Sequence, residues 1–171
     1  MEPKFVQKAA FKVAGYELKT TNVDKVNYQV LPEFWNRYFA ENWGKVLHDK
    51  IKPVSHAELG ICFPGGLEEG EFSYVIGVEV ADFDGAPEGL FKGEVPAATY
   101  AVFTSPPAER EGYQFSKAIQ GTWDYIYASW FLGSGYEFDD HSRIDFELYD
   151  ERSMGDHGIQ ADIYIPVVKK R

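Results

Sequence analysis

The stretch EFSYVIGVEV, residues 71–80, sets the interpretation of the whole chain. Apolar or aromatic side chains occupy every second position from Phe72 to Val80, which is the period of a β-strand. The apolar run from His56 to Phe63 precedes it and ends at Pro64-Gly65-Gly66, a strong turn signal. These two segments are expected to be consecutive strands joined by an acidic loop.

The segment before these strands carries apolar residues at steps of three and four, and this spacing predicts an amphipathic helix from Val26 to Asn42. Pro32 lies inside this range and is tolerated only near the first turn of the helix. The segment from Phe5 to Leu18 alternates imperfectly around Gly15, which predicts a first strand with a bulge or a close backbone approach. The first half is therefore expected to run strand, helix, strand, strand.

The chain after residue 80 repeats this order. A passage rich in glycine and proline, from Asp82 to Pro96, is the candidate linker between the two halves. It is followed by an expected strand at Ala97–Thr104, a helical stripe from Phe115 to Trp130 that ends at Gly133-Ser134-Gly135, and two strands at Arg143–Asp150 and Ala161–Val168. The second half thus also reads strand, helix, strand, strand.

This duplicated order predicts an α+β fold in one domain, residues 1–171, with halves at about 1–89 and 90–171. A unit of about 80 residues cannot cover both faces of its own sheet, so the two units are expected to pack together. The strands within each half are expected to pair antiparallel, with the helices on one face. A concave pocket is expected at the seam between the halves.

The amino-acid composition disfavours several classes of function. The 171 residues include 27 acidic and 17 basic side chains, a net charge of −10, and no clustered basic surface of the kind that binds phosphates. Direct nucleic-acid binding and attachment to an anionic membrane are therefore disfavoured. A single cysteine and a start without an apolar signal core favour a reduced, cytoplasmic protein. The high aromatic content indicates a structure in which rings dominate.

Several common chemistries find no support in the sequence. The four histidines at positions 48, 56, 141 and 157 lack paired ligand spacing, so no metal site is expected. The glycine-rich segment at 63–66 lacks the lysine of a phosphate loop, and no Gly-x-Ser-x-Gly elbow occurs. Cys62 lies in an apolar strand and is expected to be an inert thiol. No cofactor is expected.

The last two expected strands combine carboxylates with tyrosines. In the strand from Arg143, the side chains of Asp145, Glu147 and Tyr149 share one face, while Ile144, Phe146 and Leu148 share the face expected to meet the core. In the last strand, Tyr164 lies on the face opposite to Ile163. Such faces fit either a solvated sheet surface or a pocket in which rings stack on a flat ligand and a carboxylate compensates its positive charge.

An ordered set of short strings spans nearly the whole chain and resembles the GyrI-like small-molecule-binding family, which is also found as the effector-binding domain of bacterial multidrug-responsive transcription activators. The strings are FSYVIGVEV (72–80), VPAATYAVF (95–103), WDYIYASWF (123–131), SGY (134–136), DFELY (145–149) and DIYIPV (162–167). The family's fold is a duplicated strand-helix-strand-strand unit, the SHS2 type, with pseudo-twofold symmetry.

The resemblance also implies site residues. In the family, a glutamate on the penultimate strand recognises cationic lipophilic compounds, and the matching position is Glu147. Tyrosines and tryptophans line the family's pocket, and the matching positions are Tyr164, Trp123, Tyr127 and Tyr100. For each of these aromatic residues, packing in the core is an equally open interpretation.

The resemblance leaves three functions open. The chain shows no helix-turn-helix before Phe5, so it is expected to be a stand-alone domain that senses or sequesters amphipathic, aromatic, cationic compounds. Alternatively, like some stand-alone relatives, it hydrolyses cyclopropane-bearing alkylating compounds with Glu147 as the catalytic group. The third function is a protein-binding inhibitor of the DNA gyrase type, for which the acidic runs at 68–71 and 139–140 are the relevant features.

Overall fold

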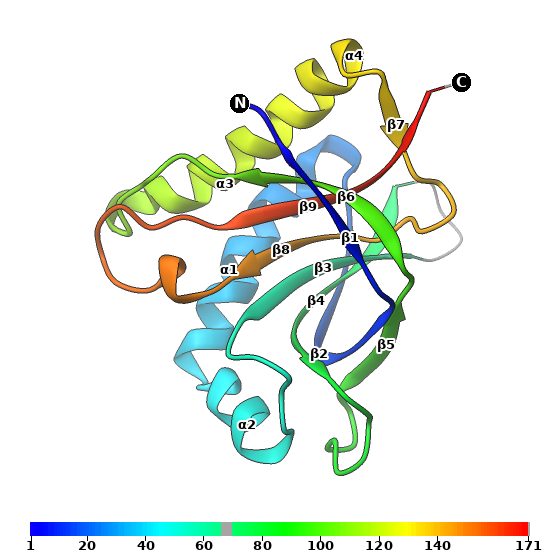
Figure 1. Cartoon of the computed structure of the whole chain (residues 1–171). Coiled ribbons are helices and arrows are strands. Elements are labelled where there is room, and N and C mark those ends of the chain that lie inside the picture. The colour runs from blue at the N-terminus through cyan, green and yellow to red at the C-terminus, as the bar shows by residue number, and fades with distance from the viewer. Residues whose placement is uncertain (66–69, 171) are drawn as a thin grey trace.

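The structure is a computed structural model that describes residues 1–65 and 70–170. In this part of the chain, nine strands form an antiparallel sheet (Figure 1). The strands are β1 (Lys4–Lys8), β2 (Phe11–Thr21), β3 (Glu58–Pro64), β4 (Glu71–Val80), β5 (Phe91–Val95), β6 (Ala98–Thr104), β7 (Tyr136–Phe138), β8 (Asp145–Tyr149) and β9 (Asp162–Lys169). The α-helices are α1 (Val26–Ala40), α2 (Trp43–Lys50), α3 (Gln114–Tyr125) and α4 (Phe131–Gly133), and α3 continues into a π-helical turn, η3 (Ile126–Trp130).

The strand order is symmetric about the centre of the sheet. It runs β1-β6-β9-β8-β3-β4-β2-β5, with β7 paired to β9 outside this path. The first unit is β2-α1-β3-β4, the second is β6-α3-β8-β9, and the central pair β3–β8 joins them. The α+β fold with two antiparallel strand-helix-strand-strand units and pseudo-twofold symmetry is therefore confirmed.

Two edge strands are exchanged between the units. β1 precedes β2 in the chain but pairs with β6, and β5 precedes β6 but pairs with β2. The expectation of one continuous strand from Phe5 to Leu18 is therefore wrong, because the chain breaks between β1 and β2 to reach two different partners. The segment from Asp82 to Pro96 is likewise more than a linker, since it contains β5.

Gly15 marks a close backbone approach rather than a bulge. It lies opposite Gly77 in the β2–β4 ladder, and a Cβ atom at Gly15 would lie 2.3 Å from the backbone oxygen of Ile76. Only residues without a side chain allow these two strands to come so close.

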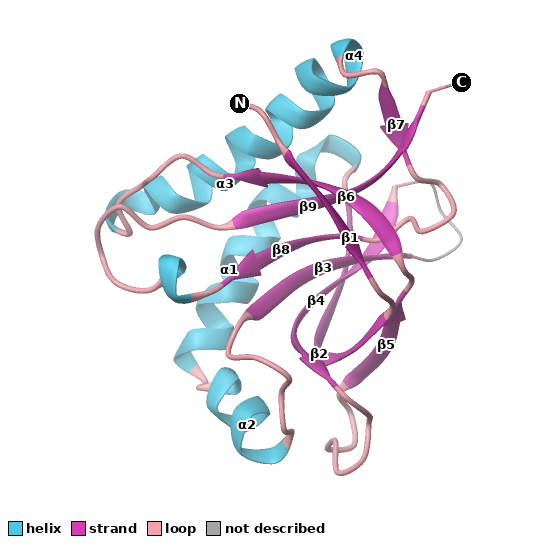
Figure 2. Cartoon of the chain, in the orientation of Figure 1, coloured by secondary structure: helices cyan, strands magenta, loops and turns pink. Residues whose placement is uncertain are grey.

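The α-helices cover one face of the curved sheet (Figure 2). α1 and α2 pack on the strands of the first unit through a cluster that includes Phe34, Leu47 and Ile76. α3 packs on β6 and β9 through a second cluster that includes Ile119 and Ile163. The opposite face of the sheet encloses a third cluster of aromatic and aliphatic residues, among them Phe11, Ile61, Val75, Val95, Tyr100, Val102 and Phe146. The sheet is thus buried on both faces.

The helices differ from the sequence-based expectation in three respects. α1 ends at Ala40, close to the predicted Asn42, but Pro32 is its seventh residue and not part of its first turn. The sequence pattern does not predict α2. The second helix, predicted as one stripe to Trp130, changes to a π-helical turn at Ile126. In the described residues, no helix is long and apolar enough to span a bilayer.

Candidate ligand-binding site

A cavity of about 1990 Å³ lies over the central strands, between the helices of the two units. Its lining includes Trp35 and Phe39 of α1, Trp123 of α3, Cys62 of β3 and Glu147 of β8. The position follows from the way the helices pack, because α1 and α2 cover the strands on one side of the centre and α3 covers those on the other. The pocket therefore lies at the seam between the two units.

The ladder registers explain why the floor of this cavity is polar. Ile76, Gly60, Glu147 and Ile163 form one row across β4, β3, β8 and β9. Ile76 is covered by the first helical cluster and Ile163 by the second. The two central positions of the row, Gly60 and Glu147, lie between the clusters, where the helices leave the sheet uncovered by apolar side chains.

Glu147 is the centre of a network of aromatic hydrogen-bond donors. Its side chain is buried, with only 6% of the residue surface exposed. Oε2 accepts from the hydroxyl of Tyr74 at 2.6 Å and from that of Tyr149 at 2.8 Å, and Oε1 accepts from Nε1 of Trp123 at 2.7 Å. Nε1 of Trp35 donates to Tyr74 Oη at 3.0 Å, which extends the network to α1. Donors from both units thus converge on a single carboxyl group.

Burial is the main influence on the charge of Glu147. It raises the pKa of the carboxyl above its usual range, while the hydrogen bonds from Tyr74, Trp123 and Tyr149 act in the opposite direction by stabilising the ionised form. In the described part of the chain, Glu147 forms no ion pair. The site therefore holds a buried acidic group without a basic partner.

Gly60 makes room for this network. It pairs with Glu147 in the β3–β8 ladder. A Cβ atom at this position would lie 2.1 Å from the hydroxyl oxygen of Tyr74 and 2.7 Å from Oε2 of Glu147. Since both contacts are far below van der Waals distance, a side chain at Gly60 would displace the hydrogen bond between the two residues.

Aromatic rings form the walls of the cavity on both sides of the carboxyl group. On α1, Trp35 stacks with Phe39 at a centroid distance of 5.7 Å and meets Tyr149 edge-on at 4.8 Å. On the other side, the rings of Trp123 and Tyr127 are nearly parallel, with 10° between their planes. Such an arrangement can hold a flat aromatic or a lipophilic cation between ring faces.

The structure brings three of the five residues expected to bind ligand into this cavity. Glu147, Trp123 and Tyr127 all line it. Trp123 also packs against the helical cluster of α3, so for this residue the core and pocket interpretations both hold. Tyr100 and Tyr164 do not line the cavity and lie instead on the opposite face of the sheet.

The strand register is the reason for this correction. Tyr164 pairs with Phe146, whereas Ile163 pairs with Glu147. Tyr164 therefore shares the face of Phe146, and their rings stack at a centroid distance of 4.5 Å. Tyr100 is fully buried and meets the ring of Phe146 edge-on at 5.3 Å. Both tyrosines belong to the third cluster, inside the curve of the sheet.

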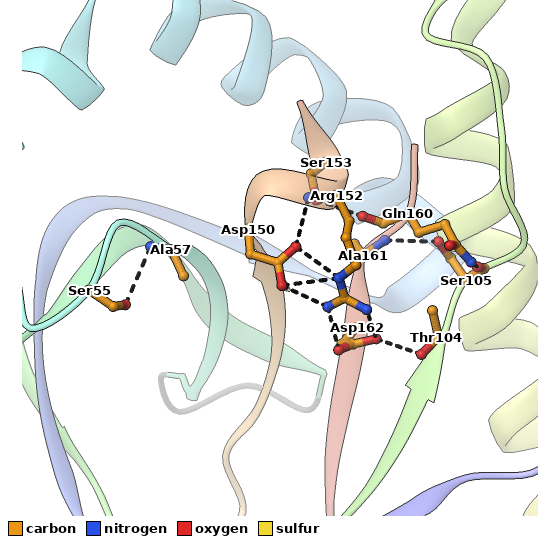
Figure 3. A network of polar contacts seen from close by, with 10 residues as sticks. All are labelled: Ser55, Ala57, Thr104, Ser105, Asp150, Arg152, Ser153, Gln160, Ala161 and Asp162. Atoms are coloured by element: carbon orange, nitrogen blue, oxygen red, sulfur yellow. Dashed lines mark hydrogen bonds and ion pairs between the residues drawn. The ribbon is translucent and has the colours of Figure 1, made fainter. Parts of the chain in front are cut away.

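The carboxylate of Asp162, on the same strand as Tyr164, has a structural role. Arg152 bridges Asp150 at 2.8 Å and Asp162 at 2.7 Å, and Thr104 donates to Asp162 at 2.6 Å (Figure 3). The turn after β8 is thereby fixed to β9 and β6. This carboxylate is paired with a cation of the protein, in contrast to Glu147.

Two residues of this site, Trp35 and Tyr74, are not among the candidates that the sequence indicates. Two others, Asp145 and Tyr149, are placed by the alternation on the face of Glu147 but without a role of their own. Trp35 lies in the apolar stripe of the helix predicted at 26–42, and Tyr74 lies in the alternating stretch at 72–80. A chemical argument could have indicated Trp35 and Tyr74, because buried tryptophan and tyrosine need hydrogen-bond partners for their polar atoms.

Two other sequence-based expectations concern groups near the site. Burial raises the pKa of the Cys62 thiol well above its ordinary value, which agrees with an unreactive side chain. Of the acidic runs, Glu68 and Glu69 lie outside the described residues, and Asp139 accepts a hydrogen bond from the backbone of His141. Among the described residues, no cluster of His, Cys, Asp and Glu is arranged to hold a metal ion.

Comparisons with known proteins agree with this geometry. The curated transcriptional regulator BrlR of Pseudomonas aeruginosa is 31% identical over 172 residues, which cover 98% of this chain and 56% of BrlR. The chain therefore spans little more than half the length of that relative.

Solved structures show the same fold. The structure of SAV2435 bound to tetraphenylphosphonium matches with a TM-score of 0.77 and 23% identity, over 98% of this chain and 94% of SAV2435. An integron cassette protein from the mobile metagenome of Vibrio cholerae matches with a TM-score of 0.67 and 15% identity, over 98% of this chain and 96% of that protein.

The profile of a protein family gives the most direct assignment. The family Cass2, described as integron-associated effector binding protein, matches residues 4–167. This match covers almost the whole chain and confirms the resemblance inferred from the ordered strings. The chain belongs to the Cass2 family of GyrI-like effector-binding proteins, and it is a small-molecule effector-binding domain.

Proposed function

We propose that the effector is an amphipathic, aromatic cation, held in the cavity between α1 and α3 by a domain that senses or sequesters such compounds. The observation that carries this proposal is the buried carboxyl of Glu147, which three aromatic donors orient and no basic side chain neutralises in the described residues. Burying an unpaired charge is costly, and a cationic guest would offset that cost.

The walls of the cavity support the same class of compound. A cation over an aromatic face gains about 0.5 to 2 kcal/mol per contact, and Trp35, Trp123 and Tyr127 offer such faces. The basic residues of the lining, such as Lys45 and Arg143, are exposed, whereas Asp145 and Glu147 are buried. The negative charge is therefore concentrated at the floor, where screening by water is weakest.

One structural neighbour offers a concrete probe. SAV2435 has been solved with tetraphenylphosphonium, an aromatic cation without hydrogen-bond donors. The net charge of −10 of the present chain would also favour the approach of cations over anions.

The test is a calorimetric titration with tetraphenylphosphonium and with triphenylphosphine oxide, a neutral compound of similar shape. We expect Glu147→Gln to weaken the binding of tetraphenylphosphonium by about tenfold or more, because one unit of negative charge is lost at a buried site. The neutral compound should bind both proteins equally.

Glu151→Gln is the matched control. It makes the same chemical change at an exposed glutamate that is outside the cavity lining. It should leave both affinities unchanged. Equal losses for cation and neutral compound in Glu147→Gln would contradict charge matching, and failure of wild-type protein to bind tetraphenylphosphonium would contradict the proposed class of effector.

We also propose that the bound compound is released unchanged. Glu147, the expected catalytic group of a hydrolase, already accepts three hydrogen bonds, so few lone-pair positions are left to activate water. Mass spectrometry of a cyclopropane-bearing electrophile after incubation with the protein checks this point. Repeated formation of a product heavier by one water, lost in Glu147→Gln, would instead identify a hydrolase.

A further inference from the structure

A second carboxyl group in the cavity is only partly satisfied. Asp145 lies two residues before Glu147 on the same face of β8, lines the cavity, and has 9% of its surface exposed. Its Oδ1 atom has no hydrogen-bond partner among the described residues. A buried acceptor without a donor is unfavourable, so this atom is a position where a ligand's donor would be stabilising.

The groups around Asp145 are weak donors. The hydroxyl of Tyr127 reaches Oδ2 at 3.3 Å, a long contact for a hydrogen bond of this type. The thiol of Cys62, directly across on β3, is a weak donor and makes no standard hydrogen bond to Oδ1. A charged N–H of a ligand would be a stronger donor than either.

Tyr127 is the residue that such a donor would displace. It is 49% exposed, and it lies in the π-helical turn η3 rather than in the regular part of α3. The residue covers Asp145 through a single long hydrogen bond. Exchange of this contact for a ligand N–H would therefore replace a weak interaction by a charge-assisted one.

We propose that Asp145 is the hydrogen-bond acceptor for an N–H group of the bound cation, so that the cavity prefers cations with amino groups over cations that are fully substituted. This proposal rests on the proposed function and refines its ligand class. The two carboxyl groups then have different roles. Glu147, whose oxygens already accept hydrogen bonds from the protein, contributes negative charge, and Asp145 contributes a directional hydrogen-bond acceptor.

The charge of Asp145 should vary near neutral pH. Burial raises its pKa to about 7, the weakly donating Cys62 thiol and the Tyr127 hydroxyl act to lower it, and the neighbouring Glu147 raises it. The carboxylate of Asp145 also interacts electrostatically with the hydroxyl of Tyr100, and Arg143 lies two positions earlier in the chain, before β8 begins. Above this pH the ionised carboxylate accepts most strongly, and below it the acceptor loses its charge.

The test compares two dyes of equal charge. Rhodamine 123 carries amino groups, and tetramethylrhodamine methyl ester has the same ring and ester but no N–H. Fluorescence anisotropy gives the dissociation constant of each. We expect wild-type protein to bind rhodamine 123 about tenfold more tightly, in line with hydrogen bonds to charged groups. In Asp145→Asn the ratio of the two dissociation constants should fall to about one. Glu147→Gln should weaken the binding of both dyes by the same factor.

The possible outcomes separate the role of Asp145 from the proposed function. Equal affinities in wild-type protein, or a ratio that persists in Asp145→Asn, would overturn the role of Asp145. If tetraphenylphosphonium binds while the dyes show no preference, the proposed function stands and this inference fails. If no cation binds, the proposed function itself fails and this inference with it.

The wild-type protein provides a test that needs no variant. Lowering the pH through about 7, the pKa of Asp145, should reduce the preference for rhodamine 123, because the carboxylate is neutralised while both dyes keep their charge. A preference for rhodamine 123 that stays constant across this range would overturn the proposal even if Asp145→Asn does not fold.

Discussion

The carboxyl groups of Glu147 and Asp145 lie on one face of β8 but differ in how well the folded protein stabilises their ionised forms, because their hydrogen-bond donors differ. Glu147 and Asp145 are similarly buried, but Glu147 accepts three short hydrogen bonds. Asp145 accepts one long hydrogen bond from Tyr127, has the weak Cys62 thiol as a further donor, and keeps Oδ1 without a partner among the described residues. The folded protein therefore stabilises the ionised form of Glu147 better than that of Asp145. This difference makes Asp145 the residue whose replacement should have the clearest effect on stability.

We expect Asp145→Asn to stabilise the protein at alkaline pH. Burial raises the pKa of Asp145 from 3.8 to about 7, so between these values the folded state holds a proton that the unfolded state has lost. The wild-type free energy of unfolding must then fall as pH rises through this window, by on the order of 2 to 4 kcal/mol. Urea unfolding should show Asp145→Asn to be more stable by up to this amount near pH 8.

The two proteins should converge in stability as the pH falls below 3.8, where aspartic acid is neutral in the folded and the unfolded state, as asparagine is. Asp162→Asn is the control of opposite sign, because it removes the carboxylate that pairs with Arg152 and should lower stability at pH 8. A destabilised Asp145→Asn variant at pH 8 would show that the carboxylate is better satisfied than its contacts indicate.

At the scale of elements, Pro32 links the two long helices across the cavity. Proline has no N–H, so the carbonyl of Tyr28, four residues earlier, lacks its usual partner within α1. The side-chain amide of Gln120, on α3, donates to this carbonyl at 3.4 Å. The hydroxyl of Tyr28 in turn donates to Asp124 at 3.1 Å. The carbonyl that Pro32 leaves without a partner in α1 thus accepts a hydrogen bond from α3.

A double-mutant cycle tests this link. Gln120→Ala should cost about 0.5 to 1 kcal/mol in wild-type protein, since it leaves the Tyr28 carbonyl without a donor. In a Pro32→Ala background the restored N–H at position 32 bonds to that carbonyl, and the cost should nearly vanish. Urea unfolding of the four proteins gives the coupling. An equal cost of Gln120→Ala in both backgrounds would show that the two residues act independently.

The elements were predictable from the sequence wherever local pattern determines them. The stripes of α1 and α3 and the alternation of β4 depend on residues that are neighbours in the chain. The partner of each strand depends on distant segments, so the exchange of β1 and β5 could not be predicted. The alternation places Tyr164 correctly on the face opposite Ile163, but both faces of β9 are buried, and only the register with β8 shows that the Tyr164 face is turned away from the cavity.

At the scale of the whole molecule, the two units are incomplete without each other. Among the described residues, β1 pairs only with β6 of the second unit, β5 pairs only with β2 of the first, and β3–β8 closes the centre. The site is equally divided, because Tyr74 and Trp35 come from the first unit, whereas Trp123, Tyr149 and Glu147 come from the second. Folding and ligand binding should therefore require both units.

We expect fragments 1–89 and 90–171 to be unfolded when separate and to assemble when mixed. The cut falls beside Gly89, in a turn where the backbone has a φ of +88° and a Cβ atom would meet no neighbour, so it should not disturb a packed element. Each fragment alone lacks the partner of its edge strand, the first fragment lacks Glu147 and the second lacks its donor Tyr74. A unit of about 80 residues also buries little surface on its own. Circular dichroism should show a cooperative melting transition, and calorimetry should show binding of tetraphenylphosphonium, only for the equimolar mixture. A cooperative transition in either fragment alone would mean that one unit folds autonomously and that the exchanged strands are dispensable for its stability.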